Sequence, residues 1–313
     1  MTGRALVTGA AGFVGTTLCA HLEAQGWEVV RVVQTGQEGG IPTDITQPGL
    51  LDAVFAEAGP LTHVFHLAAI AFVPMANENP VLAMNVNLNG TINVAAAMRK
   101  HVPGARLIFI SSSDAYGAPL SLPMTESHPL DPVNVYSISK AAADHYCAYL
   151  HRSQGLDVIR MRPFNHSGPR QEAAFFLPSC ARQIAEIEAG ARPPVIQVGN
   201  LAAARDFLHV DDVIRAFEAA ALRGMPGEAY NVCSGRSWTM AQALEMLVSR
   251  STAKITTEID PDRVRPVDVP NVVGCSEKLR FETGWAPKKT FENLLDDLLD
   301  YWRRRVLLEL GGK

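Results

Sequence analysis

The fold is predicted by the stretch Thr8-Gly9-Ala10-Ala11-Gly12-Phe13-Val14-Gly15. It follows an apolar run at residues 5–8 and leads directly into a helical pattern at residues 16–25. A chain that turns from strand into helix needs glycine at the turn, at the point where a pyrophosphate approaches, and where the helix packs on the strand. The free N–H groups at the start of such a helix attract phosphate. The stretch therefore predicts a strand, a turn and a helix that bind a dinucleotide.

Short runs rich in β-branched residues alternate with longer amphipathic segments through the first half of the chain. Continuous apolar runs of this kind are typical of parallel strands that are buried on both faces and joined by crossover helices. The runs lie at residues 28–33, 63–67, 106–111 and 156–161. The pattern predicts an α/β Rossmann fold with a doubly wound parallel sheet.

A second, smaller α/β domain for the substrate is expected after residue 162, where prolines break the alternation. Helical and strand patterns at residues 211–222 and 229–232 can rejoin the first sheet, so we expect the second domain to be discontinuous. The predicted Rossmann domain comprises residues 1–163 and 206–233, and the predicted substrate domain comprises residues 164–205 and 234–313.

The composition of the 313 residues excludes several classes of protein. With 28 basic and 32 acidic residues, a net charge of −4 and no basic run, the chain is not expected to bind nucleic acid. No stretch reaches the ~18 apolar residues that cross a bilayer, and no signal-peptide core opens the sequence, so we expect a cytoplasmic protein without a membrane partner. The five widely spaced cysteines suit reduced thiols, and no zinc-ligand spacing is present, so no metal is predicted.

The glycine spacing G-x-x-G-x-x-G indicates a short-chain dehydrogenase, and the second strand then selects the cofactor. An acidic residue at the end of that strand would accept the ribose hydroxyls of NAD, but Val33 and Gln34 stand there. Arg31 can pair with the 2′-phosphate of NADP, although alternation along the strand equally predicts a solvated edge position. The sequence thus favours NADP(H) slightly and leaves NAD(H) possible. Asp44 and Ile45 are expected at the adenine pocket, with a plain loop carboxylate as the alternative for Asp44.

Acid-base chemistry is predicted by Tyr136 and Lys140, whose spacing of four places both side chains on one helical face. A cation beside a phenol lowers the pKa of the phenol, which can then exchange a proton with a sugar hydroxyl during hydride transfer. Ser111-Ser112-Ser113-Asp114 ends the fourth apolar run, at the crevice where doubly wound sheets bind ligands. We expect Ser112 to hold the substrate oxygen. His66 is expected to be a buried, hydrogen-bonded histidine rather than a proton carrier.

Five motifs together resemble the extended short-chain dehydrogenases/reductases that act on nucleotide sugars. They are T-G-A-A-G-F-V-G, H-L-A-A at residues 66–69, N-L-N-G-T at 87–91, S-S-S-D-A-Y-G at 111–117 and Y-S-I-S-K at 136–140. The resemblance implies catalytic roles for Ser112, Tyr136 and Lys140, and a homodimer formed by helices at residues 81–100 and 135–152. The expected cofactor contacts are Gly9, Gly12, Phe13, Val14, Gly15, Arg31, Asp44, Ile45, Leu67, Ala68, Ala69, Asn87, Ser111, Tyr136, Lys140 and Pro163.

Motifs in the second half are most similar to the GDP-mannose branch of that family, and within it to the reductases of GDP-4-keto-6-deoxy-mannose, which form GDP-rhamnose. They are R-P-F-N-H-S-G-P-R-Q at residues 162–171, G-N-L-A-A-A-R-D-F at 199–207, Y-N-V-C-S-G at 230–235, R-P-V-D-V-P at 265–270 and T-G-W-A-P at 283–287. A guanidinium pairs with phosphate oxygens in a bidentate way, so two of the arginines are expected to clamp the GDP diphosphate, with surface salt bridges as the alternative. These are Arg205 and Arg265, and the other expected substrate contacts are Ser113, Asn165, Arg170 and Asp268.

The nearest competing function is that of a GDP-mannose 4,6-dehydratase, which needs a further carboxylate acid/base. In the dehydratases that base resembles a Glu two residues before the Tyr-Gly pair, whereas this chain has the shorter Asp114, a fourth candidate catalytic residue. The departure favours reduction, while Arg170 in G-P-R-Q follows the dehydratase pattern. Another nucleotide-sugar epimerase, or an NAD(P)-sensing regulator without turnover, stays open as an alternative.

Overall fold

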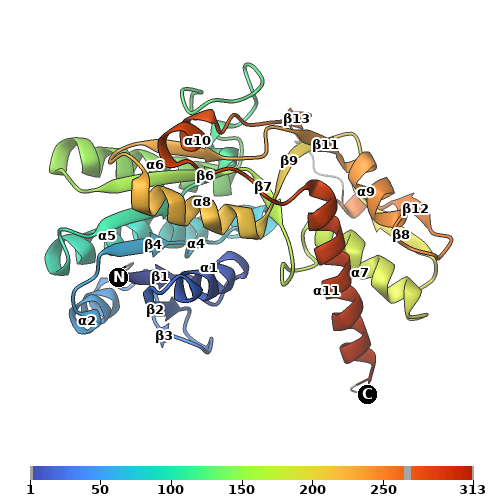
Figure 1. Ribbon diagram of the computed structural model, residues 1–313, viewed down its shortest axis with the longest axis horizontal. Coiled ribbons are helices and arrows are strands. Elements are labelled where there is room, and N and C mark those ends of the chain that lie inside the picture. Colours follow the sequence, from blue (N-terminus) through green and yellow to red (C-terminus); the bar gives the residue numbers. More distant parts are fainter. Residues whose placement is uncertain (1–2, 264–268, 312–313) are drawn as a thin grey trace.

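A seven-stranded parallel sheet lies at the centre of the larger unit of the computed structural model, which describes residues 3–263 and 269–311 (Figure 1). The strand order is β10-β6-β5-β4-β1-β2-β3, so β2 and β3 lie on one side of β1 and the later strands, beginning with β4, lie on its other side. The strands are β1 (Arg4–Thr8), β2 (Glu28–Val33), β3 (Ile41–Pro42), β4 (His63–His66), β5 (Arg106–Ile110), β6 (Val158–Pro163) and β10 (Ala229–Val232). This order confirms the predicted doubly wound Rossmann fold, including the return of the last strand beside β6.

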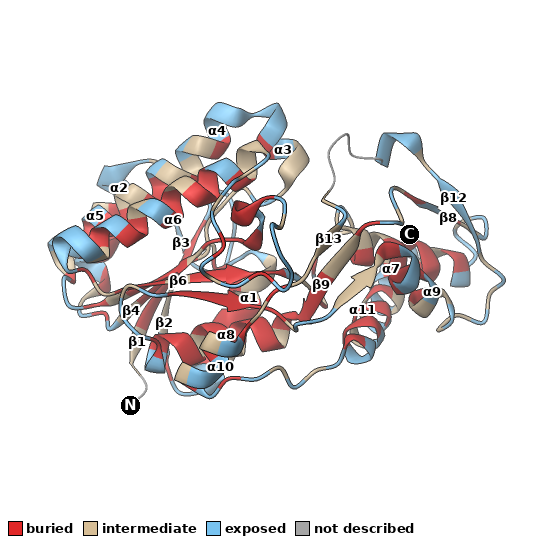
Figure 2. Ribbon diagram, turned by 90° about the horizontal axis from the view of Figure 1, so that it is seen from above, coloured by how far each residue is buried: buried red, intermediate tan, exposed pale blue. Residues whose placement is uncertain are grey.

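Helices cover both faces of this sheet (Figure 2). One face packs on α2 (Pro48–Ala58), α5 (Gly90–His101) and α6 (Val135–Gln154). The other packs on α1 (Phe13–Ala24), α8 (Val210–Arg223) and α10 (Glu277–Thr283). Because both faces are covered, the strands are apolar along their length, which explains the continuous runs in the sequence.

The helical pattern at residues 81–100 is interrupted in the structure. It consists of α4 (Pro80–Met84), a π-helical turn at Asn85–Asn89 and α5, after the short helix α3 (Val73–Glu78). Such π-helical turns occur frequently at functional sites. Here the turn holds Asn87, which is buried.

A smaller unit with two further sheets lies beside the Rossmann sheet (Figure 1). One sheet contains β7 (Asn165–Ser167), β9 (Ala204–His209), β11 (Ser237–Thr239) and β13 (Asn271–Val272), and the other pairs β8 (Val195–Val198) with β12 (Thr256–Ile259). Its core is formed with α7 (Phe176–Glu188), α9 (Met240–Val248) and α11 (Phe291–Gly311). Two 3₁₀ turns complete the elements, η2 at Ser113–Tyr116 and η3 at Pro261–Arg263.

The predicted domain boundaries stay a prediction, and two packing contacts bear on them. Strand β9 (Ala204–His209) pairs with β7, β11 and β13 in the four-stranded sheet of the smaller unit. Residues 206–209 were expected in the Rossmann domain. Leu279 and Trp285 are buried in the core formed by α1 and α8, although residues 234–313 were expected in the substrate domain. The sequence pattern did not indicate this return because α10 is only one short helix.

No helix within residues 3–263 and 269–311 has the length and apolar character needed to cross a membrane. Over the same residues, the structure brings together no group of three or more His, Cys, Asp or Glu that could hold a metal ion. All five cysteines are free, and four of them are buried.

Candidate active site

The glycine turn between β1 and α1 brings three backbone segments into close contact. Gly9 has a φ of +70°, and a Cβ atom there would lie 2.8 Å from the backbone N of Ala68. A Cβ on Gly15 would lie 2.0 Å from the carbonyl oxygen of Gly9. Only glycine fits these two positions, because the clashing atoms are backbone and cannot turn away.

Helix α1 begins without a side-chain cap, since its N-cap residue is Gly12. The N–H groups of its first turn, which starts at Phe13 and Val14, have no intrahelical acceptor and are available to an anion. The Phe13 ring stacks on His166 with 6.2 Å between ring centroids. This geometry fits the pyrophosphate of a dinucleotide.

Two buried polar side chains, Lys140 and Ser111, are candidates to bind the nicotinamide half of a dinucleotide. Lys140 is buried on α6, with its Nζ 4.8 Å from the centre of the Phe109 ring. The Ser111 hydroxyl is buried at the carboxyl end of β5 and has no hydrogen-bond partner in the structure. A buried ammonium and a buried unpaired hydroxyl are costly unless a ligand binds them, so these residues fit a nicotinamide cofactor.

Ser112, Tyr136 and Asp114 lie together at the same edge of the sheet. Ser112 caps the 3₁₀ turn η2, and its Oγ accepts a hydrogen bond from the Asp114 N–H at 3.1 Å. Tyr136 lies in the first turn of α6, whose capping box is formed by Asn134 and Ser137. The phenol of Tyr136 hydrogen-bonds to the Ser112 side chain and is within electrostatic reach of the Asp114 carboxylate.

The pKa of Tyr136 differs from the prediction. Burial, followed by the Asp114 carboxylate, raises the pKa of the phenol above its usual value, and the hydrogen bond with Ser112 lowers it by less. Burial has also lowered the pKa of Lys140 to about 8. The raised pKa of the phenol is opposite in direction to the shift expected from the lysine, and the catalytic roles expected for Tyr136 and Lys140 stay predictions.

The residues expected around the adenine have partners within the protein. The Arg31 guanidinium on β2 is held by both carboxylate oxygens of Glu23 at 2.8 and 2.7 Å. Asp44 accepts hydrogen bonds from the N–H and the hydroxyl of Thr46 at 2.9 and 2.7 Å, which is the local turn considered as its alternative. Ile45 is buried in the core beneath α5.

Leu67, Ala68 and Ala69 follow β4 and are half-buried beside the glycine turn. The amide of Asn87 holds the next residue of this loop, with Oδ1 accepting from the Ile70 N–H at 2.8 Å and Nδ2 donating to the Ile70 carbonyl at 3.1 Å. Nδ2 also donates to the Ser139 hydroxyl at 2.8 Å. Asn87 therefore ties the loop to the helix that carries Tyr136.

His66 is buried and hydrogen-bonded, as predicted. Its Nδ1 lies 2.7 Å from the Thr8 hydroxyl and its Nε2 lies 3.0 Å from the Thr91 hydroxyl. Burial and the nearby Lys140 ammonium lower the pKa of His66 to about 3. The histidine is therefore neutral and serves to connect β1, β4 and α5.

The expected substrate residues lie mainly on segments that follow β5 and β6. Ser113 is buried in η2 and Asn165 is exposed at the start of β7, whereas Pro163, an expected cofactor contact, is buried at the end of β6. On β9, Arg205 donates from Nη1 to the carbonyls of Ala204 and Val269 at 2.8 and 2.7 Å. Two further expected contacts, Arg265 and Asp268, lie outside the described residues.

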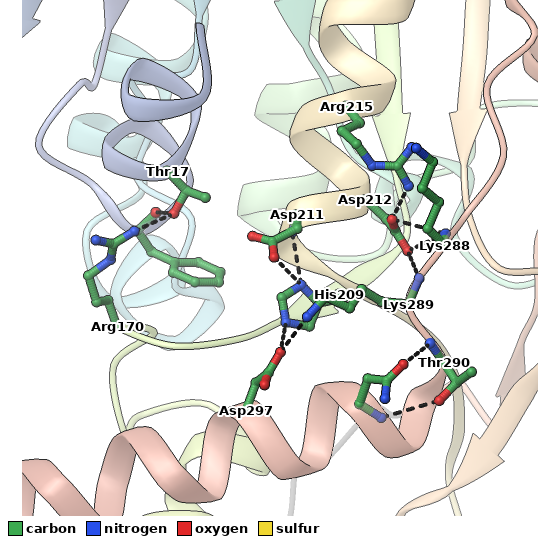
Figure 3. Close-up of polar contacts among 12 residues, drawn as sticks. Thr17, Arg170, His209, Asp211, Asp212, Arg215, Lys288, Lys289, Thr290 and Asp297 are labelled. Atoms are coloured by element: carbon green, nitrogen blue, oxygen red, sulfur yellow. Dashed lines mark hydrogen bonds and ion pairs between the residues drawn. The ribbon is translucent and has the colours of Figure 1, made fainter. Parts of the chain in front are cut away.

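Arg170 points toward Thr17 on α1 (Figure 3), while its expected contact with the substrate stays a prediction. Its Nη2 donates to the Thr17 hydroxyl on α1 at 3.0 Å. The backbone of Arg170 has a φ of +74°, a left-handed conformation that is unusual for a residue other than glycine. In this structure Arg170 links the segment after β7 to the phosphate-binding helix.

Figure 3 also shows a second junction, at the start of α8. The buried Asp212 carboxylate accepts hydrogen bonds from the N–H groups of Lys288 and Lys289 at 2.9 to 3.1 Å, and it pairs with Arg215. These bonds fix the segment that leads from α10 to α11.

Buried charges beneath the site were missed by the sequence analysis. Asp144 on α6 is completely buried and pairs with Arg160 and Arg162 of β6. On β9, the buried carboxylate of Asp206 accepts from the N–H groups of Ser234, Gly235 and Gly274. The one available signal was the presence of two arginines in the otherwise apolar run at residues 158–163, since buried charges are almost always paired.

Comparison with known proteins identifies the family. The GDP-mannose 4,6 dehydratase family profile matches residues 6–298. GDP-6-deoxy-D-mannose reductase from Pseudomonas aeruginosa is 34% identical over 310 residues, covering 98% of this chain and 99% of the relative. UDP-glucose 4-epimerase from Streptomyces lividans is 29% identical, covering 96% of each.

Two solved structures are also similar. RMD from Pseudomonas aeruginosa, complexed with NADPH, superposes with a TM-score of 0.88 at 32% identity over 97% of this chain and 99% of that one. UDP-glucose 4-epimerase from Thermus thermophilus, complexed with NAD, superposes with a TM-score of 0.84 at 30% identity over 96% of this chain and 99% of that one. The resemblance read from the motifs is thus confirmed, and the chain belongs to the GDP-mannose 4,6-dehydratase family of NAD(P)-dependent nucleotide-sugar short-chain dehydrogenases/reductases.

Proposed function

We propose that the protein reduces the C4 keto group of GDP-4-keto-6-deoxy-mannose and so forms GDP-rhamnose. The observation that carries this choice within the family is the similarity to GDP-6-deoxy-D-mannose reductase, which extends over nearly the whole of both chains. A protonated Tyr136 adds support, because a reduction needs a proton donor beside the carbonyl oxygen.

In this reaction the bound cofactor supplies a hydride to C4 of the sugar. Ser112 donates a hydrogen bond to the carbonyl oxygen and so polarises the carbonyl. Tyr136 gives its proton to the same oxygen as negative charge develops there. The Lys140 ammonium stabilises the phenolate that remains and holds the nicotinamide ribose. The balance is one hydride added to carbon and one proton added to oxygen.

The remaining candidate residues are assigned by the same proposal. Gly9, Gly12 and Gly15 admit the pyrophosphate, while Arg205 binds the GDP diphosphate. Asn165 and Ser113 contact the sugar. For the cofactor we propose a small preference for NADP(H), with NAD(H) accepted, because no acidic residue ends β2. A 2′-phosphate would compete with Glu23 for the Arg31 guanidinium, whose Nε and Nη2 donate to this carboxylate.

The reaction should lose activity as the pH rises above about 8. Burial favours the neutral amine of Lys140 and lowers its pKa to about 8, so the ammonium exists below that pH and disappears above it. We expect kcat/KM for the reduction to be constant from pH 6 to about pH 7.5 and to fall toward tenfold per pH unit above pH 8.5, because kcat/KM reports the pKa values of the free enzyme. The pH dependence of kcat/KM measures this, and a flat profile to pH 10 would contradict it.

The proposed reaction is tested by mixing the purified protein with NADH or NADPH and following nicotinamide absorbance. One sample receives GDP-mannose, and a second receives GDP-mannose already converted by a separate 4,6-dehydratase. We expect oxidation only in the second sample, with the faster cofactor identifying the preference. A keto sugar that accumulates from GDP-mannose alone would overturn the proposal.

The dehydratase reaction is the second candidate, and it is supported by the family profile and by Asp114 beside Tyr136. The Arg170 argument for it is weaker than the sequence suggested, because this side chain bonds to Thr17 on α1. An epimerase would return the hydride to the same sugar and would purify with cofactor tightly bound. A regulator without turnover would tolerate loss of Tyr136.

We also propose that two copies form a homodimer through α4 and α6. These helices expose the large apolar side chains Val81, Leu82, Ile138 and Tyr149. Exposed apolar surface is typical of protein interfaces, and these side chains belong to the helical segments at residues 81–100 and 135–152 that the family resemblance implies for a homodimer.

A further inference from the structure

The Arg162 side chain joins three elements beneath the active site. It lies on β6 and is 4% exposed, so all its hydrogen bonds are to protein groups. Its Nε and Nη2 donate to the two carboxylate oxygens of Asp144 at 2.9 and 2.8 Å. Its Nη1 donates to the Tyr116 hydroxyl at 3.0 Å. The planar guanidinium therefore fixes Asp144 and Tyr116 relative to each other.

Each of these partners lies on an element that carries a reacting side chain. Asp144 is one helical turn after Lys140 and two turns after Tyr136 on the same face of α6. Tyr116 ends the 3₁₀ turn η2, whose N-cap residue is Ser112. Arg162 consequently connects α6, which carries Tyr136, to the turn η2, which is capped by Ser112.

Further bonds fix this connection to the sheet. The Tyr116 hydroxyl donates to Asn231 Oδ1 on β10 at 2.7 Å. Asp144 also accepts from Arg160 Nη1 at 2.8 Å, so its buried charge has two cationic partners. In a dry interior these bonds are strong and directional, and they resist small displacements of the elements that they join.

We propose that Arg162, through Asp144 and Tyr116, is a positioning residue that holds the Ser112 hydroxyl and the Tyr136 phenol in the geometry needed for proton transfer. The inference rests on the proposed reduction, since both hydroxyls act on the same carbonyl oxygen. A displacement of about 1 Å between reacting groups can cost about 100-fold in rate, so a scaffold residue can control kcat without touching the substrate.

The test variant is Tyr116→Phe, which keeps the ring and the ion pair of Asp144 but removes the hydroxyl that Arg162 and Asn231 share. The matched control is Tyr230→Phe. Tyr230 is equally buried on β10, and its hydroxyl bonds to Glu282 and to the Met225 N–H on the opposite face of the sheet. Both variants lose one buried tyrosine hydroxyl, but only the first should disturb the site.

For Tyr116→Phe we expect kcat for the keto sugar to fall about tenfold, with the KM and the cofactor dissociation constant within about twofold of wild type. The solvent deuterium isotope effect on kcat should rise, because proton transfer becomes slower. Tyr230→Phe should retain wild-type kcat. Arg162→Lys keeps the positive charge but loses the planar guanidinium that bonds to both Asp144 and Tyr116. In this variant kcat should fall by more than in Tyr116→Phe, and KM should stay the same.

Three results would overturn the positioning role: a kcat in Tyr116→Phe within twofold of wild type, an equal loss in Tyr230→Phe, or a KM that rises in proportion to the loss. Failure of the proposed reaction is distinguishable, because then the wild-type protein itself does not reduce the keto sugar. In that event the same two variants are compared in the conversion of GDP-mannose, which also depends on Ser112 and Tyr136.

Discussion

Tyr136→Phe should lower kcat for the reduction by about 10³-fold, within the range of 10²–10⁴ that general acid catalysis contributes. The variant keeps the ring and its packing but removes the proton that the carbonyl oxygen receives. It should fold normally, because the phenol makes one hydrogen bond, to Ser112. The cofactor dissociation constant should change little, and fluorescence titration with NADPH measures it beside steady-state kinetics.

The matched control for this variant is Tyr149→Phe. Tyr149 lies on the same helix, is 45% exposed, and has a hydroxyl that accepts a hydrogen bond from Gln154 at 3.2 Å. We expect this control to have wild-type kcat. If Tyr136→Phe keeps more than a tenth of the wild-type kcat, the phenol is not the proton donor.

Gly15→Ala should weaken the binding of the nicotinamide cofactor by about 100-fold, which corresponds to about 2.7 kcal/mol. The added Cβ would lie 2.0 Å from the Gly9 carbonyl oxygen and 2.9 Å from the Ala10 Cα. Neither atom can rotate away, so the turn must open and its N–H groups must move from the position that a pyrophosphate requires. Calorimetric titration with NADPH and with NADH measures the loss.

Gly49→Ala is the control, because it adds a methyl group at a position where no steric clash results. Gly49 lies in α2, and an added Cβ meets no atom within 4 Å. This variant should bind cofactor normally and gain about 0.5 kcal/mol in the free energy of unfolding, because alanine restricts the unfolded chain. If Gly15→Ala binds NADPH as tightly as this control does, the glycine turn is not the pyrophosphate site.

Much of the fold was predictable because its signals are local in the sequence. The glycines of the first turn, the apolar runs of β1, β2, β4, β5 and β6, and the capped start of α6 depend on neighbouring residues. The same holds for the pair Tyr136 and Lys140, since one helical turn separates them. Ser112 was a candidate because parallel strands end at one edge of the sheet, where ligands bind, and its role stays a prediction.

Other features depend on residues that are distant in sequence. The π-helical turn at Asn85–Asn89 replaced a predicted regular helix, and it directs Asn87 to Ile70 and Ser139. Arg170 meets Thr17, which is 153 residues away. No periodicity or motif encodes such pairings, because they follow from the way separate elements pack.

The Rossmann fold and the glycine turn were predictable from the sequence, and the candidate reacting side chains could be named from it, because these depend on spacing and side-chain chemistry. The surroundings of those side chains depend on how the elements pack. Burial and Asp114 raise the pKa of Tyr136, and burial lowers the pKa of Lys140, so the phenol pKa shifts in the direction opposite to the one expected. The physical reason is that desolvation depends on the atoms that surround a group in space, and a sequence does not state which atoms these are.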